Sequence, residues 1–110
     1  MLIFKICDRT DWEAAERTGV YAGSGKDRAD GFLHFSSDAQ LAGTLERHYA
    51  DAGNLVLVAV EADELEEALK WEISRGGEKF PHLYSALPVS MVKWTAELQR
   101  GEDGSFVLPF

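Results

Sequence analysis

Apolar residues recur along the chain in short runs that polar turns separate, a pattern typical of β-strands. The clearest run, residues 55–60, is apolar on both faces, so we expect it at the centre of a sheet covered on both sides. We expect the first run, residues 2–7, to be central as well. Periodicity alone also allows a helix over residues 89–98. The pattern as a whole predicts strands over residues 2–7, 32–36, 55–60, 70–74, 80–84, 89–98 and, after a hairpin signal at 102–104, 105–110.

Two segments, residues 11–18 and 38–50, carry apolar residues at helical spacing. A shorter helical turn is expected over residues 64–69. The order of elements predicts one α+β domain with a mixed, mostly antiparallel sheet and two helices in the N-terminal half. The expected helix caps and their capping-box partners are Thr10 with Glu13 and Ser37 with Gln40.

Residues 20–30 contain two glycines among charged and hydroxyl residues, so we expect a loop there. Its Gly-Ser-Gly-Lys stretch has some likeness to a phosphate-binding loop. That motif needs its lysine at the start of a helix, whereas this stretch leads toward a strand. A mobile flap beside a ligand pocket is the better interpretation, because ligand contacts concentrate on loops.

Residues 30–37 contain two of the candidate functional side chains, His34 and Ser36. Side chains alternate between the two faces of a strand. Phe32, His34 and Ser36 therefore share one face. A histidine and a hydroxyl side by side at the end of a buried strand predict a polar pocket.

Charge and composition narrow the classes of function. The chain has 110 residues, one cysteine and a net charge of −8, which suggests one domain, excludes a disulfide framework or a cysteine-based zinc site, and argues against nucleic-acid binding. No apolar stretch reaches the roughly 18 residues of a membrane span, and the N-terminus lacks the features of a signal peptide. We therefore expect a cytoplasmic protein that is not bound to a membrane.

Specific short motifs follow one another along nearly the whole chain. They are Ile3-Phe4-Lys5-Ile6, Trp12, Gly19-Val20-Tyr21, the run from Asp30 to Ser36, Gln40, Trp71-Glu72, the run from Phe80 to Tyr84, Leu87-Pro88 and the run from Phe106 to Pro109. In order and spacing these motifs resemble those of the Domain of Unknown Function 952 family, small bacterial proteins named only by number. That family is in turn similar in fold to ADP-ribosyltransferases, so the resemblance implies an ADP-ribosyltransferase-like fold and NAD as the leading candidate ligand.

The same resemblance implies roles for residues on three strands. In ADP-ribosyltransferases an early strand carries a residue that grips NAD, and its position falls near Lys5. A second strand lines the nicotinamide site, here near His34 and Ser36, and a third carries a catalytic glutamate, here best matched by Glu72. That carboxylate would stabilise a developing positive charge.

The residues themselves support a related set of roles. His34 is the candidate general acid or base, because imidazole titrates near neutral pH, and Ser36 could donate a hydrogen bond to a ligand. Lys5 either extends along the strand edge toward water or reaches an anionic ligand. His82 and Tyr84 could form a second wall of the cleft, which would take a nucleotide-like ligand.

Three alternatives remain open. The histidines and hydroxyls could form a buried polar network with no ligand. The domain could instead be a non-catalytic module that binds a protein. His34, His48, His82 and Glu72 are also residue types that bind zinc, although their spacing matches no local metal motif.

Overall fold

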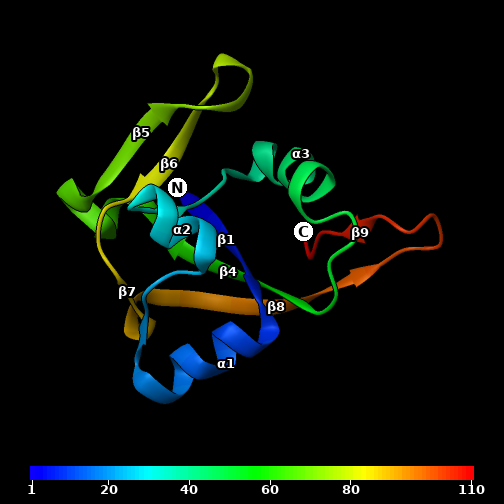
Figure 1. Ribbon diagram of the computed structural model, residues 1–110, viewed down its shortest axis with the longest axis horizontal. Helices are drawn as coiled ribbons and strands as arrows, with labels where there is room; N and C mark the ends of the chain where they lie inside the picture. Colours follow the sequence, from blue (N-terminus) through cyan, green and yellow to red (C-terminus); the bar gives the residue numbers. More distant parts are fainter.

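Three small antiparallel sheets and three α-helices make up the computed structural model (Figure 1). The structure describes residues 1–110 with the exception of the side chain of Arg75. The elements in chain order are β1 (Leu2–Asp8), α1 (Arg9–Thr18), β2 (Val20–Tyr21), α2 (Gly25–Asp30), β3 (Leu33–His34), α3 (Asp38–His48), β4 (Leu55–Glu61), the 3-10 helix η1 (Ala62–Ala68), β5 (Leu69–Ile73), the 3-10 turn η2 (Arg75–Gly77), β6 (Lys79–Leu83), β7 (Leu87–Pro88), the 3-10 turn η3 (Val89–Met91), β8 (Val92–Arg100) and β9 (Phe106–Val107).

The main sheet has the strand order β1-β4-β8-β9, a second sheet has the order β3-β6-β5, and β2 pairs with β7. Each pairing that the structure describes between these strands is antiparallel. Reciprocal backbone hydrogen bonds of 2.8 Å between Phe4 and Ser36 link β1 to the segment after β3. The α+β class is therefore confirmed, but the strands form three sheets rather than one.

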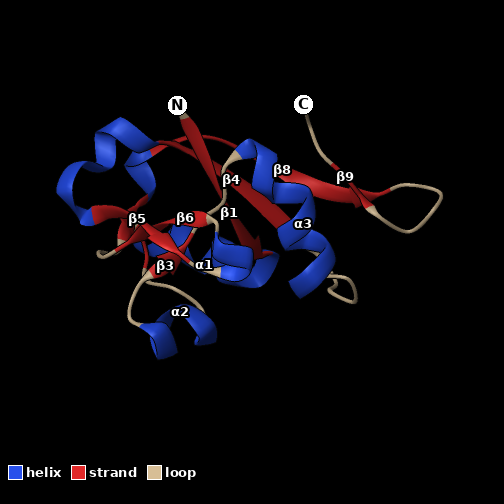
Figure 2. Ribbon diagram, turned by 90° about the horizontal axis from the view of Figure 1, so that it is seen from above, coloured by secondary structure: helices blue, strands red, loops and turns tan.

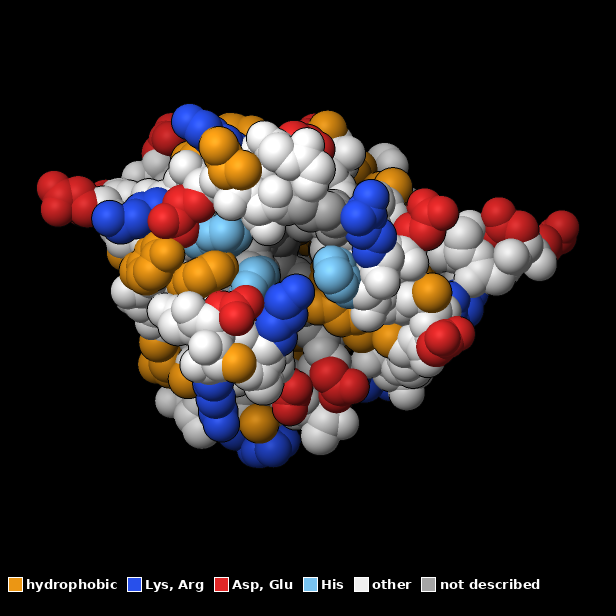
Figure 3. Space-filling view, turned by 45° about the horizontal axis from the view of Figure 1, so that its top comes forward, with side chains coloured by type: hydrophobic (Ala, Val, Ile, Leu, Met, Phe, Trp, Pro, Cys, Tyr) orange, Lys and Arg blue, Asp and Glu red, His pale blue; other side chains and the backbone are white. Residues whose placement is uncertain are grey.

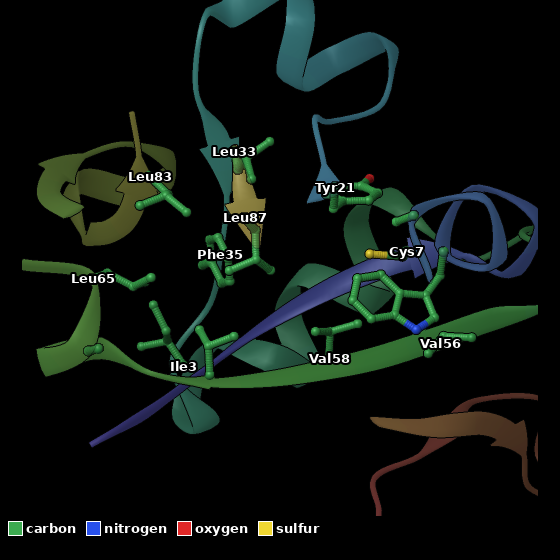
Figure 4. Close-up of a cluster of buried hydrophobic side chains, with 14 residues drawn as sticks. Ile3, Cys7, Tyr21, Leu33, Phe35, Val56, Val58, Leu65, Leu83 and Leu87 are labelled. Atoms are coloured by element: carbon green, nitrogen blue, oxygen red, sulfur yellow. The ribbon is translucent and has the colours of Figure 1, made fainter. Parts of the chain in front are cut away.

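The core occupies both faces of the main sheet. Figure 4 shows one face, where Ile3, Val58 and Phe35 lie among the buried side chains that contact α1 and the second sheet. The other face packs against α3 through Leu41 and Leu45. Every residue of β4 except its last is buried, which confirms the prediction of a central, doubly covered strand.

Helix caps follow the sequence signals in part. Ser37 and Gln40 form the predicted capping box of α3. The predicted cap of α1 at Thr10 is wrong, because the side chain of Asp8 accepts a hydrogen bond from the backbone N–H of Thr10 and begins the helix earlier. Asp8, two residues before Thr10, is an equally good N-cap residue. The sequence therefore did not decide between the two positions.

The predicted loop over residues 20–30 is wrong. This segment contains the strand β2 and the helix α2, and Figure 2 shows α2 beside β3 on the side of the molecule away from both chain ends. Ser24 and Asp27 form a capping box, and Gly31 ends α2 in the left-handed conformation. These local signals are the usual ones for a helix. The prediction of a loop followed instead from the two glycines and the charged residues of the segment.

Four strand predictions also need correction. β1 lies at the end of the main sheet rather than inside it, and its second edge meets Ser36 through an isolated bridge. The strand expected over residues 32–36 contains only Leu33–His34. The strand expected over residues 89–98 begins after the turn η3, and the last strand contains only Phe106–Val107. None of the helices that the structure describes is long and apolar enough to cross a bilayer.

Cys7 is predicted to be chemically inert in the folded protein. The residue is 1% exposed, and burial raises the pKa of its thiol to about 12. Because the thiolate is the reactive form, we expect no reaction with a disulfide reagent such as DTNB in native buffer and stoichiometric reaction in guanidinium chloride. Fast labelling of the native protein would contradict the placement of β1.

Candidate functional site

A pocket of about 100 Å³ opens between β1, α2, α3, β6, and β3 with the segment that follows it. The three histidines of the chain border a hollow on the face shown in Figure 3. The pocket combines basic, hydroxyl and aromatic side chains. Its lining residues are Phe4, Lys5, Ile6, Ser24, Lys26, Asp27, His34, Phe35, Ser36, Thr44, His48, Tyr49, Ser74, Phe80 and His82.

The charge of this lining is opposite to that of the chain. The chain has 19 acidic and 11 basic residues, yet Asp27 is the only acidic residue among the described residues that line the pocket. Lys5, Lys26 and all three histidines line it. The pocket is therefore a local concentration of cationic and hydrogen-bond-donating groups in an acidic protein.

Asp27 is buried and forms hydrogen bonds to three elements that line the pocket. Its Oδ1 atom accepts hydrogen bonds from Lys5 Nζ at 3.1 Å and from the backbone N–H of His34 at 3.0 Å. Its Oδ2 atom accepts from the backbone N–H of Ser24 at 2.9 Å and from the Ser24 hydroxyl at 3.2 Å. One carboxylate thereby joins β1, the start of α2 and β3.

Two opposing effects act on the pKa of Asp27. Burial raises it, but the hydrogen bond from His34, the positive charge of Lys5 and the backbone N–H groups of Ser24 and His34 together outweigh burial and hold the pKa well below its usual value. Asp27 is therefore ionised wherever the protein is folded near neutral pH. Lys5, at the wall of the pocket, is already paired with Asp27.

His34 is held by carboxylates at both ring nitrogens. Nδ1 lies 2.7 Å from Asp27 Oδ1, and Nε2 lies 2.8 Å from Asp30 Oδ2. Both ring nitrogens of His34 are therefore engaged by carboxylates, and neither is left free to contact a ligand in the pocket.

His82 is held at one ring nitrogen. Its side chain is 7% exposed, and Nδ1 lies 2.9 Å from Glu72 Oε1. The Tyr84 hydroxyl donates to the same Glu72 oxygen at 2.7 Å, and these bonds from Tyr84 and His82 lower the pKa of Glu72. The ring of Phe32 stacks on the imidazole with 4.1 Å between centroids, so two contacts fix the orientation of His82, one at its edge and one on its face.

Four of the six predicted site residues, Lys5, His34, Ser36 and His82, line the pocket. The alternation of faces around His34 is confirmed, because Leu33 and Phe35 enter the core. The other two predicted residues, Glu72 and Tyr84, do not line the pocket and are joined to it through His82.

The sequence did not single out Asp27, Lys26 or Tyr49 as site residues, although the flap expected over residues 20–30 contains the first two. The Ser24-x-x-Asp27 spacing could have identified the capping box, but nothing local indicates that its carboxylate meets Lys5. Tyr49 remains a neutral hydroxyl, because burial raises its pKa to about 12. Within the described residues, no three histidines, cysteines or carboxylates are arranged to hold a metal ion, so the zinc alternative gains no support.

Fold and pocket together define a small α+β protein with a histidine-lined, cation-rich pocket. The chain belongs to the family described as protein of unknown function (DUF952), whose sequence model matches residues 6–95. This confirms the family resemblance that the motifs indicated. None of the curated proteins matches the chain.

Solved structures of one bacterial relative share the fold. The crystal structure of protein CC0527 from Caulobacter crescentus is 48% identical, covers 97% of this chain and 94% of its own, and has a TM-score of 0.92. A crystal structure of a double mutant of that protein is 47% identical over the same shares of both chains, also with a TM-score of 0.92. Its solution NMR structure is 49% identical, covers 94% of this chain and 90% of its own, and has a TM-score of 0.86.

Asp27→Asn is expected to destabilise the protein, because it leaves the buried Lys5 ammonium without a charged partner. Losing one partner of a buried ion pair costs roughly 3–5 kcal/mol. Since the folded pKa of Asp27 is depressed, its contribution is complete above the ordinary value of about 3.9 and is lost as pH falls below it. Urea unfolding should therefore show a gap between wild type and Asp27→Asn that narrows below about pH 4. Asp30→Asn, at an exposed carboxylate, is the control and should change stability by about 1 kcal/mol or less.

Gly23→Ala is expected to destabilise the protein through the same region around Asp27. Gly23 has a φ of +106°, and an added Cβ would lie 2.8 Å from Asp27 Cβ. Strained backbone of this kind costs about 1–3 kcal/mol. Gly25→Ala, two residues on in α2, has open space around the new Cβ and should be neutral or stabilising. Equal thermal stability of the two variants would contradict the close approach of residue 23 to Asp27.

Proposed function

We propose that the pocket binds a small anionic ligand that carries a phosphate group, with a nucleotide-like molecule as the favoured class. The observation that carries this proposal is the gathering of two lysines and all three histidines around one hollow, with Asp27 as the only described acidic lining residue. Such a charge reversal in a protein of net charge −8 favours an anion over a cation or a neutral ligand.

The donors in the lining suit phosphate oxygens. Lys26 lies at the start of α2, and Ser24 and Ser74 add hydroxyl groups to the same lining. Lysine is a common phosphate-binding residue and acts as a point charge. The positive charge of Lys5 is balanced by Asp27, so Lys26 is the lysine with more to contribute to a ligand.

The size of the pocket limits what it can enclose. Pockets that bury a drug-sized ligand measure about 300–1,000 Å³, whereas this one measures about 100 Å³. It accommodates a phosphate group or one ring, and the rest of a larger ligand would lie outside. The aromatic lining residues Tyr49 and Phe80 offer apolar surface to a base.

NAD, the candidate that the family resemblance implies, fits this proposal as one nucleotide among others. Transfer of ADP-ribose would need a glutamate at the reacting sugar, and Glu72 lies beside His82 rather than in the pocket lining. The ADP-ribosyltransferase-like fold remains part of the proposal on the strength of the sequence resemblance. The cytoplasmic location that the sequence predicts would give access to free nucleotides.

A protein-binding module is the second candidate. Trp71 and Ile73 on β5 are 38% and 70% exposed, and β5 lies at the end of the second sheet. Exposed apolar groups on an edge strand are typical of protein contacts. They lie outside the pocket lining, so the two functions can be tested separately.

A titration monitored by backbone amide NMR tests the proposal. We expect inorganic phosphate, AMP and NAD at millimolar concentrations to shift the amides of Lys26, His34, Ser36 and His82, and adenosine alone to shift them less. Lys26→Ala should weaken phosphate binding about fivefold, for roughly 1 kcal/mol lost at a solvent-facing cation. Lys93→Ala, whose lysine pairs with Glu64 elsewhere, is the matched control.

No shift in the pocket with any phosphate compound would reject the proposal. Shifts confined to Trp71 and Ile73 with a protein partner would instead favour the binding module.

A further inference from the structure

We propose that the pocket hydrolyses phosphate esters, with His82 as the general base that activates water. This inference rests on the proposed function, because the substrate is held through its phosphate group. It adds a reaction and a catalytic residue to what would otherwise be a binding site.

The first support is that His82 is both buried and rigid. Its side chain is 7% exposed, it comes from β6, and its ring stacks on Phe32. The hydrogen bond of 2.9 Å to Glu72 fixes the rotation of the ring about its own axis. A base must lie within hydrogen-bond reach of the proton it takes, and a ring held in this way gives one fixed position for that proton.

The second support is the state of its two nitrogens. The Glu72 carboxylate accepts a hydrogen bond, so the proton of a neutral imidazole is placed on Nδ1 and the lone pair on Nε2. In the part of the chain that the structure describes, nothing hydrogen-bonds Nε2. Glu72 does not line the pocket but His82 does, so the Nε2 side of the ring is the part that can meet a pocket water or ligand.

Two neighbouring groups, His34 and Ser36, are already engaged by other residues. Both ring nitrogens of His34 lie against carboxylates and are already engaged. The Ser36 hydroxyl is 3.0 Å from the Thr44 hydroxyl and therefore has a partner of its own. Among these three, only His82 combines an oriented ring with a free acceptor.

The reaction balances with water as the sole co-reactant. A water O–H proton passes to His82 Nε2 while the water oxygen forms a bond to phosphorus. The bond from phosphorus to the alcohol oxygen breaks, and its electron pair stays on that oxygen. The alcohol oxygen takes a proton from bulk water at the pocket mouth, and the His82 imidazolium returns its proton to bulk water, so one water and one ester give one alcohol and one phosphate.

Glu72 and Tyr84 are positioning residues in this scheme. Glu72 holds the Nδ1 proton and favours the charged imidazolium that forms during the reaction, as a carboxylate does in other carboxylate–histidine pairs. Tyr84 donates to the same carboxylate oxygen at 2.7 Å and keeps it directed at His82. Neither side chain needs to touch the substrate.

The test is hydrolysis of p-nitrophenyl phosphate, a monoester, and bis(p-nitrophenyl) phosphate, a diester, followed by p-nitrophenolate release. We expect wild type to hydrolyse at least one of them, and His82→Gln to reduce kcat about 100-fold or more, the usual share of a general base. Glu72→Gln should lower kcat with little change in KM and shift the acidic limb of the pH profile, where the base becomes protonated, to lower pH. Glu67→Gln removes an exposed carboxylate outside the pocket and should leave the rate unchanged.

A second measurement is made on the wild-type protein and so does not depend on whether the variants fold. The ¹⁵N shifts of the imidazole in wild-type protein report directly which ring nitrogen carries the proton. We expect a protonated Nδ1 and an unprotonated Nε2 in the neutral ring of wild type, and a larger share of the form with the proton on Nε2 in Glu72→Gln. A proton on Nε2 in wild type would overturn the assignment of His82 as base.

The hydrolysis result and the binding result separate the two proposals. Phosphate binding without hydrolysis of either ester would reject the reaction and leave the binding function standing. Hydrolysis that His82→Gln leaves intact would also reject it. Absence of both binding and hydrolysis would remove the proposed function and this inference together.

Discussion

The buried Asp27 carboxylate is the interaction on which the site depends. It binds Lys5 of β1, Ser24 at the start of α2 and His34 of β3. A buried ammonium is tolerated only when an ionised and well-bonded partner neutralises it. Because Asp27 supplies that partner, the short helix α2 is fastened over one wall of the pocket, and a lysine is retained inside an otherwise apolar strand.

This arrangement also determines the charge that a ligand meets. Asp27 lines the pocket, but both of its oxygens accept hydrogen bonds from their own donors, and its charge balances that of Lys5. Lys26 and the histidines then dominate the lining. On the opposite wall, Glu72 stays outside the pocket and acts through the ring of His82. Each carboxylate therefore orients a pocket residue, Lys5 in one case and His82 in the other.

Local sequence patterns were sufficient for several parts of this account. The apolar run of β4 predicted the central strand, Ser37 and Gln40 predicted the start of α3, and strand alternation placed His34 and Ser36 on the pocket side. The contact between Lys5 and Asp27 spans 22 residues of chain, and no pattern of spacing encodes it. For the same reason the bond between Glu72 and His82 could not be foreseen, since the register of β5 against β6 decides it.

A double-mutant cycle between Lys5 and Asp27 tests the central claim most directly. Lys5→Met and Asp27→Leu each leave one buried charge unpaired, whereas the double variant leaves none. We expect each single variant to lose several kcal/mol of unfolding free energy, the double variant to recover much of that loss, and phosphate binding to weaken in all three as α2 loses its attachment. Additive losses with unchanged phosphate binding would show that the pocket does not depend on this pair.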